Sequence, residues 1–152
     1  MTIQEFQHLK NFSINEKDIF GRVITAKIEN IQKPLMMKID KTVTFAKIEY
    51  GDWAKFIVHD INQGKHSKNS FHKVGMAIDG HFYGLSLFDQ VMLGLKEGFH
   101  GVGSYPDWEH SGIHFDIRPQ CWISMWYQGK NSEGKKIYIY DWKKILTTLR
   151  GC

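Results

Sequence analysis

Three residues in two short stretches of the sequence have the types and spacing that a catalytic zinc ion requires from a protein. The stretch "SFHKVGMAIDG", Ser70 to Gly80, places His72 and Asp79 seven positions apart, and "HSGIHFDIR" carries His114 further along. A catalytic zinc site typically takes three nitrogen or oxygen ligands from the protein and leaves one position for water. His72, Asp79 and His114 would supply such a set. The competing interpretation is a group of ordinary hydrogen-bonded histidines, since the chain contains eight of them.

The second stretch also places two charged residues beside the candidate ligand. His114, Asp116 and Arg118 occupy alternate positions in "IHFDIR". Alternate residues of a β-strand share one face. If that face forms the site, Asp116 is placed to orient a ligand or to anchor the end of the strand.

These two stretches resemble the motifs of a known family. "SFHKVGMAID" is similar to the S-x-H-x-x-G-x-A-x-D motif of the zinc D-Ala-D-Ala carboxypeptidases and L-alanyl-D-glutamate endopeptidases. Their superfamily also includes lysostaphin-like peptidases and the hedgehog signalling domain. "GIHFDIR" resembles the second motif, H-x-D, and "GVGSYP" resembles a segment of a branch common in phage and prophage proteins. The resemblance spans most of residues 11–127 and depends on two short motifs about thirty-five residues apart.

The resemblance implies a ligand set and an activity. It assigns zinc binding to His72, Asp79 and His114, and it implies hydrolysis of the peptide stems of peptidoglycan. Ser70 matches the serine of the first motif, which would hydrogen-bond a ligand or a substrate carboxylate.

The residue that would act as general base does not follow the family pattern. Many relatives have an acid three residues before the last histidine or a second histidine two before it, but here these positions hold Ser111 and Gly112. The nearest candidates are Glu109 and His110, with Asp107 just before them in a glycine-flanked loop. Either residue type can accept a proton from water or donate one to a leaving amine.

The sequence also departs from the family in its arginines. An arginine often found upstream of the first motif is missing, so Arg118 or Lys65 would hold a substrate carboxylate instead. His66, six residues before the first ligand, could support a developing oxyanion.

Hydrophobic periodicity predicts the elements that position these residues. In the first half of the chain the segment to about residue 11 is predicted irregular. A capping-box spacing at Ser13 predicts a helix along an apolar stripe from Ile19 to Leu35, complicated by Pro34 near its end. The alternating, β-branched "TVTFAKIEY", residues 42–50, predicts a strand, and residues 51–69 are predicted to be largely loop.

The second half of the chain alternates strand and helix signals. "VGMAID" predicts a strand and "SLFDQVMLGLKEG" a helix between Ser86 and Gly98. "GVGSYPDWEHSG" predicts a glycine-broken loop or short strand. Three further strands are predicted in "IHFDIR", "CWISMWY" and "KKIYIY", the last two joined by a glycine-containing turn, before a final helix capped by Asp141. This order predicts a single α+β domain over residues 1–152 with a central, mostly antiparallel sheet and flanking helices.

Composition narrows the class of protein. With 152 residues and a 42% hydrophobic fraction the chain is long enough for one folded core. There is no apolar run of about 20 residues and no signal-peptide pattern, so we expect synthesis in the cytoplasm and delivery to the cell wall by holin release or in a virion.

Cys121 and Cys152 are interpreted as free thiols of a reducing compartment. The net charge of +4 is dispersed, which does not favour nucleic-acid binding and suits the anionic cell wall.

Together these observations predict a monomeric zinc metallopeptidase of the endolysin or carboxypeptidase type, with peptidoglycan stem peptides as its partner and no membrane insertion. The alternative is a protein of the same fold that binds zinc and cell wall without catalysis. The missing acid before His114 supports that alternative. A nucleic-acid-binding domain would need a contiguous Lys/Arg face, which the sequence does not indicate.

Overall fold

The computed structural model describes residues 1–120 and 122–150, so the interpretation of Cys121 and Cys152 as free thiols falls outside the described residues. These residues form one α+β domain, as predicted, and this domain contains four α-helices and a six-stranded sheet. The helices and strands in chain order are α1 (Ile3–Gln7), α2 (Lys33–Tyr50), β1 (Phe56–Asp60), β2 (Ala77–Phe82), α3 (Leu87–Lys96), β3 (Gly101–Tyr105), β4 (Gly112–Asp116), β5 (Ser124–Lys130), β6 (Lys136–Ile139) and α4 (Trp142–Arg150); the short 3₁₀ turns are η1 (Ile28–Asn30) and η2 (Phe71–Val74).

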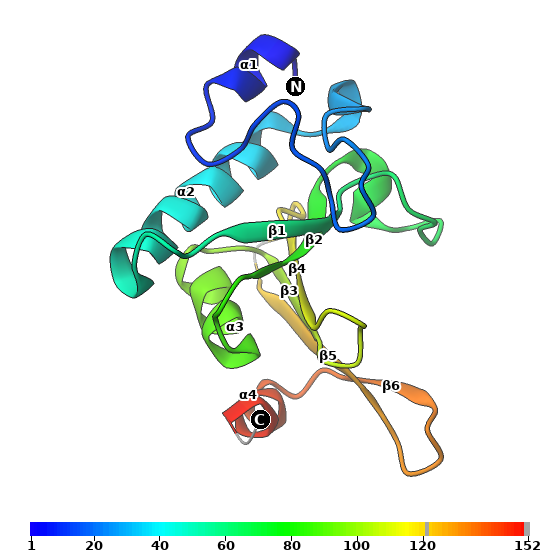
Figure 1. Ribbon diagram of the computed structural model, residues 1–152. Helices are drawn as coiled ribbons and strands as arrows, with labels where there is room; N and C mark the ends of the chain where they lie inside the picture. The colour runs from blue at the N-terminus through cyan, green and yellow to red at the C-terminus, as the bar shows by residue number, and fades with distance from the viewer. Residues whose placement is uncertain (121, 151–152) are drawn as a thin grey trace.

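The sheet has the strand order β1-β2-β4-β3-β5-β6. Strands β3 and β5 are parallel, and every other neighbouring pair in this sheet is antiparallel. The prediction of a mostly antiparallel sheet is therefore confirmed. The hairpin of β5 and β6 projects from the rest of the domain (Figure 1).

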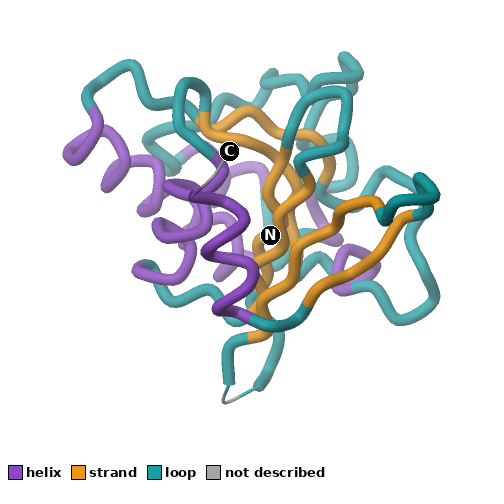
Figure 2. Tube along the Cα trace, turned by 90° about the horizontal axis from the view of Figure 1, so that it is seen from below, coloured by secondary structure: helices purple, strands orange, loops and turns teal. Residues whose placement is uncertain are grey.

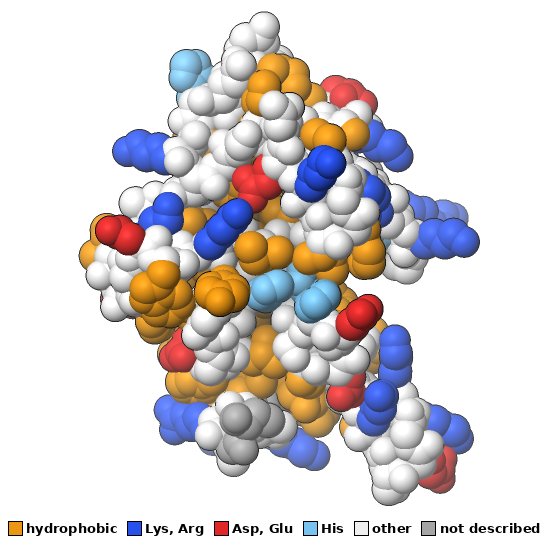
Figure 3. Space-filling model, in the orientation of Figure 1, with side chains coloured by type: hydrophobic (Ala, Val, Ile, Leu, Met, Phe, Trp, Pro, Cys, Tyr) orange, Lys and Arg blue, Asp and Glu red, His pale blue; other side chains and the backbone are white. Residues whose placement is uncertain are grey.

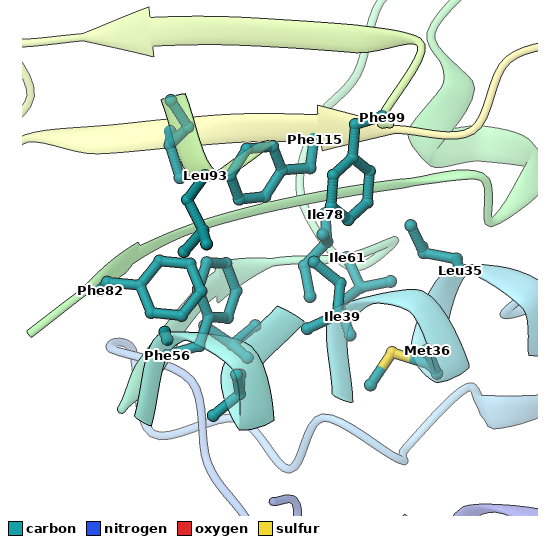
Figure 4. Packing of buried hydrophobic residues seen from close by; sticks show 14 of the residues in the cluster. Leu35, Met36, Ile39, Phe56, Ile61, Ile78, Phe82, Leu93, Phe99 and Phe115 are labelled. Carbon is teal, nitrogen blue, oxygen red and sulfur yellow. The ribbon is translucent and has the colours of Figure 1, made fainter. Parts of the chain in front are cut away.

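One face of the sheet packs against helices to form the core. Figure 2 shows most of the helical chain on one side of the strands. Leu35, Met36 and Ile39 of α2 belong to the same buried cluster as Ile78 of β2 and Phe115 of β4 (Figure 4). Because successive side chains of a strand point to opposite faces, burying Ile78 and Phe115 in this core directs their neighbours in sequence to the other face. That other face carries the candidate ligands.

The strand predicted for residues 42–50 is wrong, because these residues form the second half of α2. The buried side chains of α2 follow helical spacing, namely Leu35, Met36, Ile39, Thr42, Val43 and Ala46. Thr42 and Thr44 donate their hydroxyl hydrogen bonds to backbone carbonyls four residues earlier. Burial of one helix face therefore outweighs the β-preference of individual residues.

The helix predicted along the apolar stripe from Ile19 to Leu35 is also wrong. Most of this segment consists of turns, and α2 begins only at Lys33 with Pro34 in its first turn. Proline fits there because the first helical N–H groups need no helical partner. The Asp18 carboxylate accepts hydrogen bonds from the backbone N–H groups of residues 20 and 22 and so holds a turn. Four apolar residues of the stripe, Ile24, Ile28, Ile31 and Leu35, are nevertheless buried, so the apolar pattern here indicates burial without a helix.

The helices and strands predicted in the second half of the chain agree better with the structure. The strand in "VGMAID", the helix capped by Ser86, the three late strands and the final helix after Asp141 are all present within a few residues. Two elements were missed: the short helix α1, capped by Thr2, and strand β1. Among the described residues, no helix combines the length and apolar character needed to cross a membrane.

Candidate metal centre

A tight turn brings His72 to the sheet just before β2 begins. The Ser70 Oγ accepts a hydrogen bond from the His72 N–H (3.3 Å) and so caps η2. The turn ends at Gly75, whose φ is 66° and whose Cβ atom, if it had one, would lie 1.8 Å from the carbonyl oxygen of Asn30. Glycine is the residue that tolerates both conditions. The turn leaves the His72 ring buried beside the sheet.

Asp79 and His114 complete a group of three. They are direct partners in the ladder between β2 and β4, so their side chains leave the same face of the sheet. Asp79 Oδ1 lies 2.8 Å from His114 Nδ1 and 3.2 Å from His72 Nε2, and the two nitrogens are 3.2 Å apart. Among the described residues, no other three His, Cys, Asp or Glu place ligand atoms within 4.8 Å of one another.

These three distances suit a metal ion. In a tetrahedral site with bonds of about 2.0–2.1 Å, the ligand atoms lie about 3.3 Å apart. The atoms of His72, Asp79 and His114 therefore approximate one face of such a tetrahedron, and the group could hold a metal ion.

The outer nitrogen of each histidine is anchored, which turns the inner nitrogen toward the other ligands. The His72 Nδ1 lies 2.6 Å from the carbonyl oxygen of Ile61, and the His114 Nε2 lies 3.0 Å from Asp116 Oδ2. Both partners can only accept, so each outer nitrogen must donate. The inner nitrogens of neutral rings then present lone pairs beside the Asp79 carboxylate, and a cation would satisfy all three. Such anchoring is the usual support of metal-binding histidines.

Without a metal, a proton takes the place of the cation. Burial lowers the pKa of His114, but hydrogen bonds to Asp116 and Asp79 outweigh it and raise the pKa to about 9. Burial raises the pKa of Asp79, but the hydrogen bonds from His114 and His72 hold it well below its ordinary value. A metal ion entering this group must therefore displace a proton from His114.

Arg118, predicted to bind substrate, pairs with Asp116. Its Nε and Nη2 donate to the two carboxylate oxygens of Asp116, and its guanidinium carbon lies 4.7 Å from the centre of the Phe71 ring and 5.4 Å from that of Trp126. It therefore fixes the carboxylate that orients His114. A contact of Arg118 or of Ser70 with substrate stays a prediction, and Lys65 lies exposed in the loop before η2.

A cavity of about 310 Å³ opens beside the candidate ligands. Asp79 is part of its wall, and the loop between β3 and β4 contributes Trp108, Glu109 and His110. Histidine side chains gather near the middle of the face shown in Figure 3. Glu109 and His110, the predicted acid–base residues, are exposed and border this cavity, whereas Asp107 is exposed outside its lining.

The sequence analysis gave no role to some residues that lie at the site. Asp60 lines the cavity and its Oδ2 lies 2.9 Å from Nε2 of His66, whose ring stacks on His72 at 4.3 Å. Asp60 also pairs with Arg22 (3.3 Å). His59 borders the same cavity, where burial and the neighbouring His81 lower its pKa to about 4. The spacing of these residues carries no motif, and β1, which holds His59 and Asp60, was not predicted.

Comparisons with known proteins add no relative: no protein-family model matches the chain, and neither do any curated proteins or solved structures.

Proposed function

We propose that this chain is a zinc metallopeptidase that hydrolyses peptide bonds in the peptide stems of peptidoglycan. The observation that carries the proposal is the convergence of His72, Asp79 and His114, with both outer histidine nitrogens anchored and Asp79 in the wall of a cavity. Two imidazoles and one carboxylate, with a fourth position left for water, form a donor set typical of catalytic zinc. The motif resemblance of the sequence points to the same chemistry and supplies the substrate class.

Each part of the site has a role in this proposal. A zinc ion held by the three ligands would polarise the peptide carbonyl and lower the pKa of a water molecule. Glu109, at the rim of the cavity, would accept the proton of that water and pass it to the leaving amine, with His110 as the alternative acid–base group. Trp108 and Phe20 add apolar walls to the cavity.

The direct test is digestion of purified peptidoglycan with and without a chelator, followed by mass spectrometry of the released fragments. Loss of a terminal residue would identify a carboxypeptidase, and separated stems an endopeptidase. Glu109→Gln should keep the zinc and the fold but lower turnover by a factor on the order of 10²–10⁴, the usual contribution of acid–base catalysis. Unchanged turnover in this variant would move the role to His110, which His110→Ala tests in the same assay.

A second candidate function is zinc-dependent binding of cell wall without hydrolysis. The observation that favours it is Ser111, which stands where many members of the resembled family carry an acid and whose Oγ donates to the carbonyl oxygen of Pro106 (2.9 Å). At this position the chain therefore has a side chain that holds the loop together in place of an acid–base residue. Retention of the zinc-loaded protein on peptidoglycan, with no fragment released, would favour this function.

A further inference from the structure

Three histidines outside the candidate metal centre form a second cluster beside the same cavity. His59 comes from β1, His81 from β2, and His110 from the loop between β3 and β4. The ring centres of His59 and His81 are 4.9 Å apart, and His110 lies 6.3 Å from the first and 6.4 Å from the second. The proposed hydrolysis gives no role to His59 or His81.

His59 lies two residues after Ile57, the strand partner of His81, so strand alternation places it on the face of the sheet that carries His81. The pairing of β1 with β2 shifts its register between Val58 and Asp60. Val58 is buried in the core, whereas His59 and Asp60 both border the cavity. A bulge of this kind re-aims one side chain that regular alternation would place elsewhere, and here that side chain is Asp60. His59 Nε2 lies 2.6 Å from His81 Nδ1, so the two rings share a hydrogen bond.

The spacing of the rings suits imidazoles that share an ion. With a metal–nitrogen bond of about 2.0–2.1 Å, the ring centres of two histidines on a tetrahedral ion lie about 5 Å apart. His72 and His114 meet this value at 5.0 Å, and His59 and His81 meet it at 4.9 Å. His110 is nearly equidistant from both rings and is exposed on a loop, and its ring must move closer to both to reach the same spacing.

We propose that His59, His81 and His110 form a second metal site, which takes a late first-row divalent ion such as Zn²⁺ or Co²⁺. Neutral imidazole suits these ions. The two sites are neighbours, because Asp79 and His81 are two residues apart on one face of β2. The second ion binds more weakly than the first, since the His110 ring must move before three ligands surround it. Its binding does not depend on whether the chain hydrolyses peptides.

Titration of the metal-free full chain with Co²⁺, followed by visible absorption and calorimetry, counts the sites. We expect two ions per chain with distinct affinities. His72→Ala removes a ligand of the first centre and should leave one ion, which the double variant His72→Ala/His110→Ala should lose. His110→Ala alone should bind one ion, tightly. His8→Ala, which removes an exposed histidine at the N-terminus, should still bind two.

The variants also separate this proposal from the proposed function. His110 is exposed, so its replacement should leave circular dichroism and thermal unfolding of the metal-free chain unchanged. A wild-type chain that binds one ion, together with a His72→Ala variant that binds none, would overturn the second site and leave the first intact. Two ions bound by both His110→Ala and His81→Asn would overturn it as well. A chain that hydrolyses peptidoglycan but binds one ion would contradict only the second metal site. A chain that binds two ions but hydrolyses nothing would contradict only the proposed function.

Discussion

Asp116 is not one of the three candidate ligands, yet it determines how the ring of His114 is oriented. It is fully buried and accepts hydrogen bonds from His114 Nε2, from the Arg118 side chain and from the Arg118 backbone N–H. Gly101, its neighbour on β3, leaves the room that it needs, because a Cβ atom there would lie 2.0 Å from Asp116 Oδ2. The orientation of His114 therefore depends on a carboxylate, an arginine and a glycine at the end of the strands.

Replacement of Asp116 tests this support. Asp116→Asn should lower the affinity for zinc by about 10- to 100-fold, the usual cost of losing the hydrogen-bond partner of a metal-binding histidine. Competition with a chelator of known affinity would measure it. Asp107→Asn, at an exposed carboxylate before the cavity loop, is the matched control and should leave the affinity unchanged. Equal affinities in both variants would contradict the role of Asp116.

The pKa of His114 predicts how the metal-free chain responds to pH. Because the pKa is raised from 6.5 to about 9, the charged ring stabilises the folded state below pH 6.5, and this contribution is lost as the pH rises through about 9. Urea unfolding without metal should therefore show a free energy of unfolding that falls over this window, by at most about 1.4 kcal/mol per pH unit. His114→Gln should remove the slope.

Zinc affinity should change in the opposite direction over the same window. Binding displaces one proton from His114, so the apparent affinity should rise about tenfold per pH unit up to about pH 9. Calorimetry in two buffers of different ionisation enthalpy would count the released proton. Binding without proton release would show that the metal does not enter this group.

At the scale of the elements, the sequence predicted the convergence of the three candidate ligands better than it predicted the scaffold that carries them. Their convergence was predictable because His72 and Asp79 flank a strongly apolar strand and His114 lies in a clearly alternating one. Residues 42–50 were misread because β-branched side chains favour strands locally, whereas the burial of α2 is decided by distant partners. His59 was not placed because β1 was not predicted. Asp60 could not be placed from sequence, because a register shift between two strands leaves no local signal.

Gly75 offers a test of how η2 positions the first ligand. Gly75→Ala should destabilise the fold by more than about 1 kcal/mol, since it combines a positive φ with a collision against Asn30. Gly134→Ala has a similar φ of 75° but no atom within 4 Å, so it isolates the conformational part. Urea unfolding of both variants gives the difference. Equal losses of stability would mean that the contact with Asn30 does not constrain the turn.

At the scale of the whole molecule, the positive charge is concentrated in the C-terminal part of the chain. Residues 1–127 contain fourteen basic and fourteen acidic residues, whereas residues 128–152 contain six basic and two acidic ones. The lysines of this part, including Lys130, Lys136, Lys143 and Lys144, are exposed on the β5–β6 hairpin and α4. Exposed aromatic residues, Tyr138, Tyr140 and Trp142, lie among them. The net positive charge, which we interpreted as dispersed along the chain, thus comes from residues 128–152.

This charge distribution predicts where an anionic polymer would contact the molecule. The double variant Lys143→Gln/Lys144→Gln should be retained less on purified cell wall than the wild type, and the difference should shrink at high salt because exposed charges are screened. Lys10→Gln/Lys27→Gln removes the same charge from exposed positions elsewhere and is the control. Co-sedimentation at low and high salt measures both. Identical retention of the two double variants would contradict a C-terminal binding face.

The separation of the ligands along the chain has a consequence for the durability of the protein. His72 and His114 are 42 residues apart, so an ion that joins them acts as a reversible crosslink across β2, α3 and β3. A ligand that binds only the folded state also reduces the population of opened states. Lys65, Lys68 and Lys73 lie exposed next to the first ligand, where trypsin can cut once the loop opens. Resistance of this loop to trypsin should therefore rise with metal occupancy, so a chain that has lost its ion would be the one that proteases remove first.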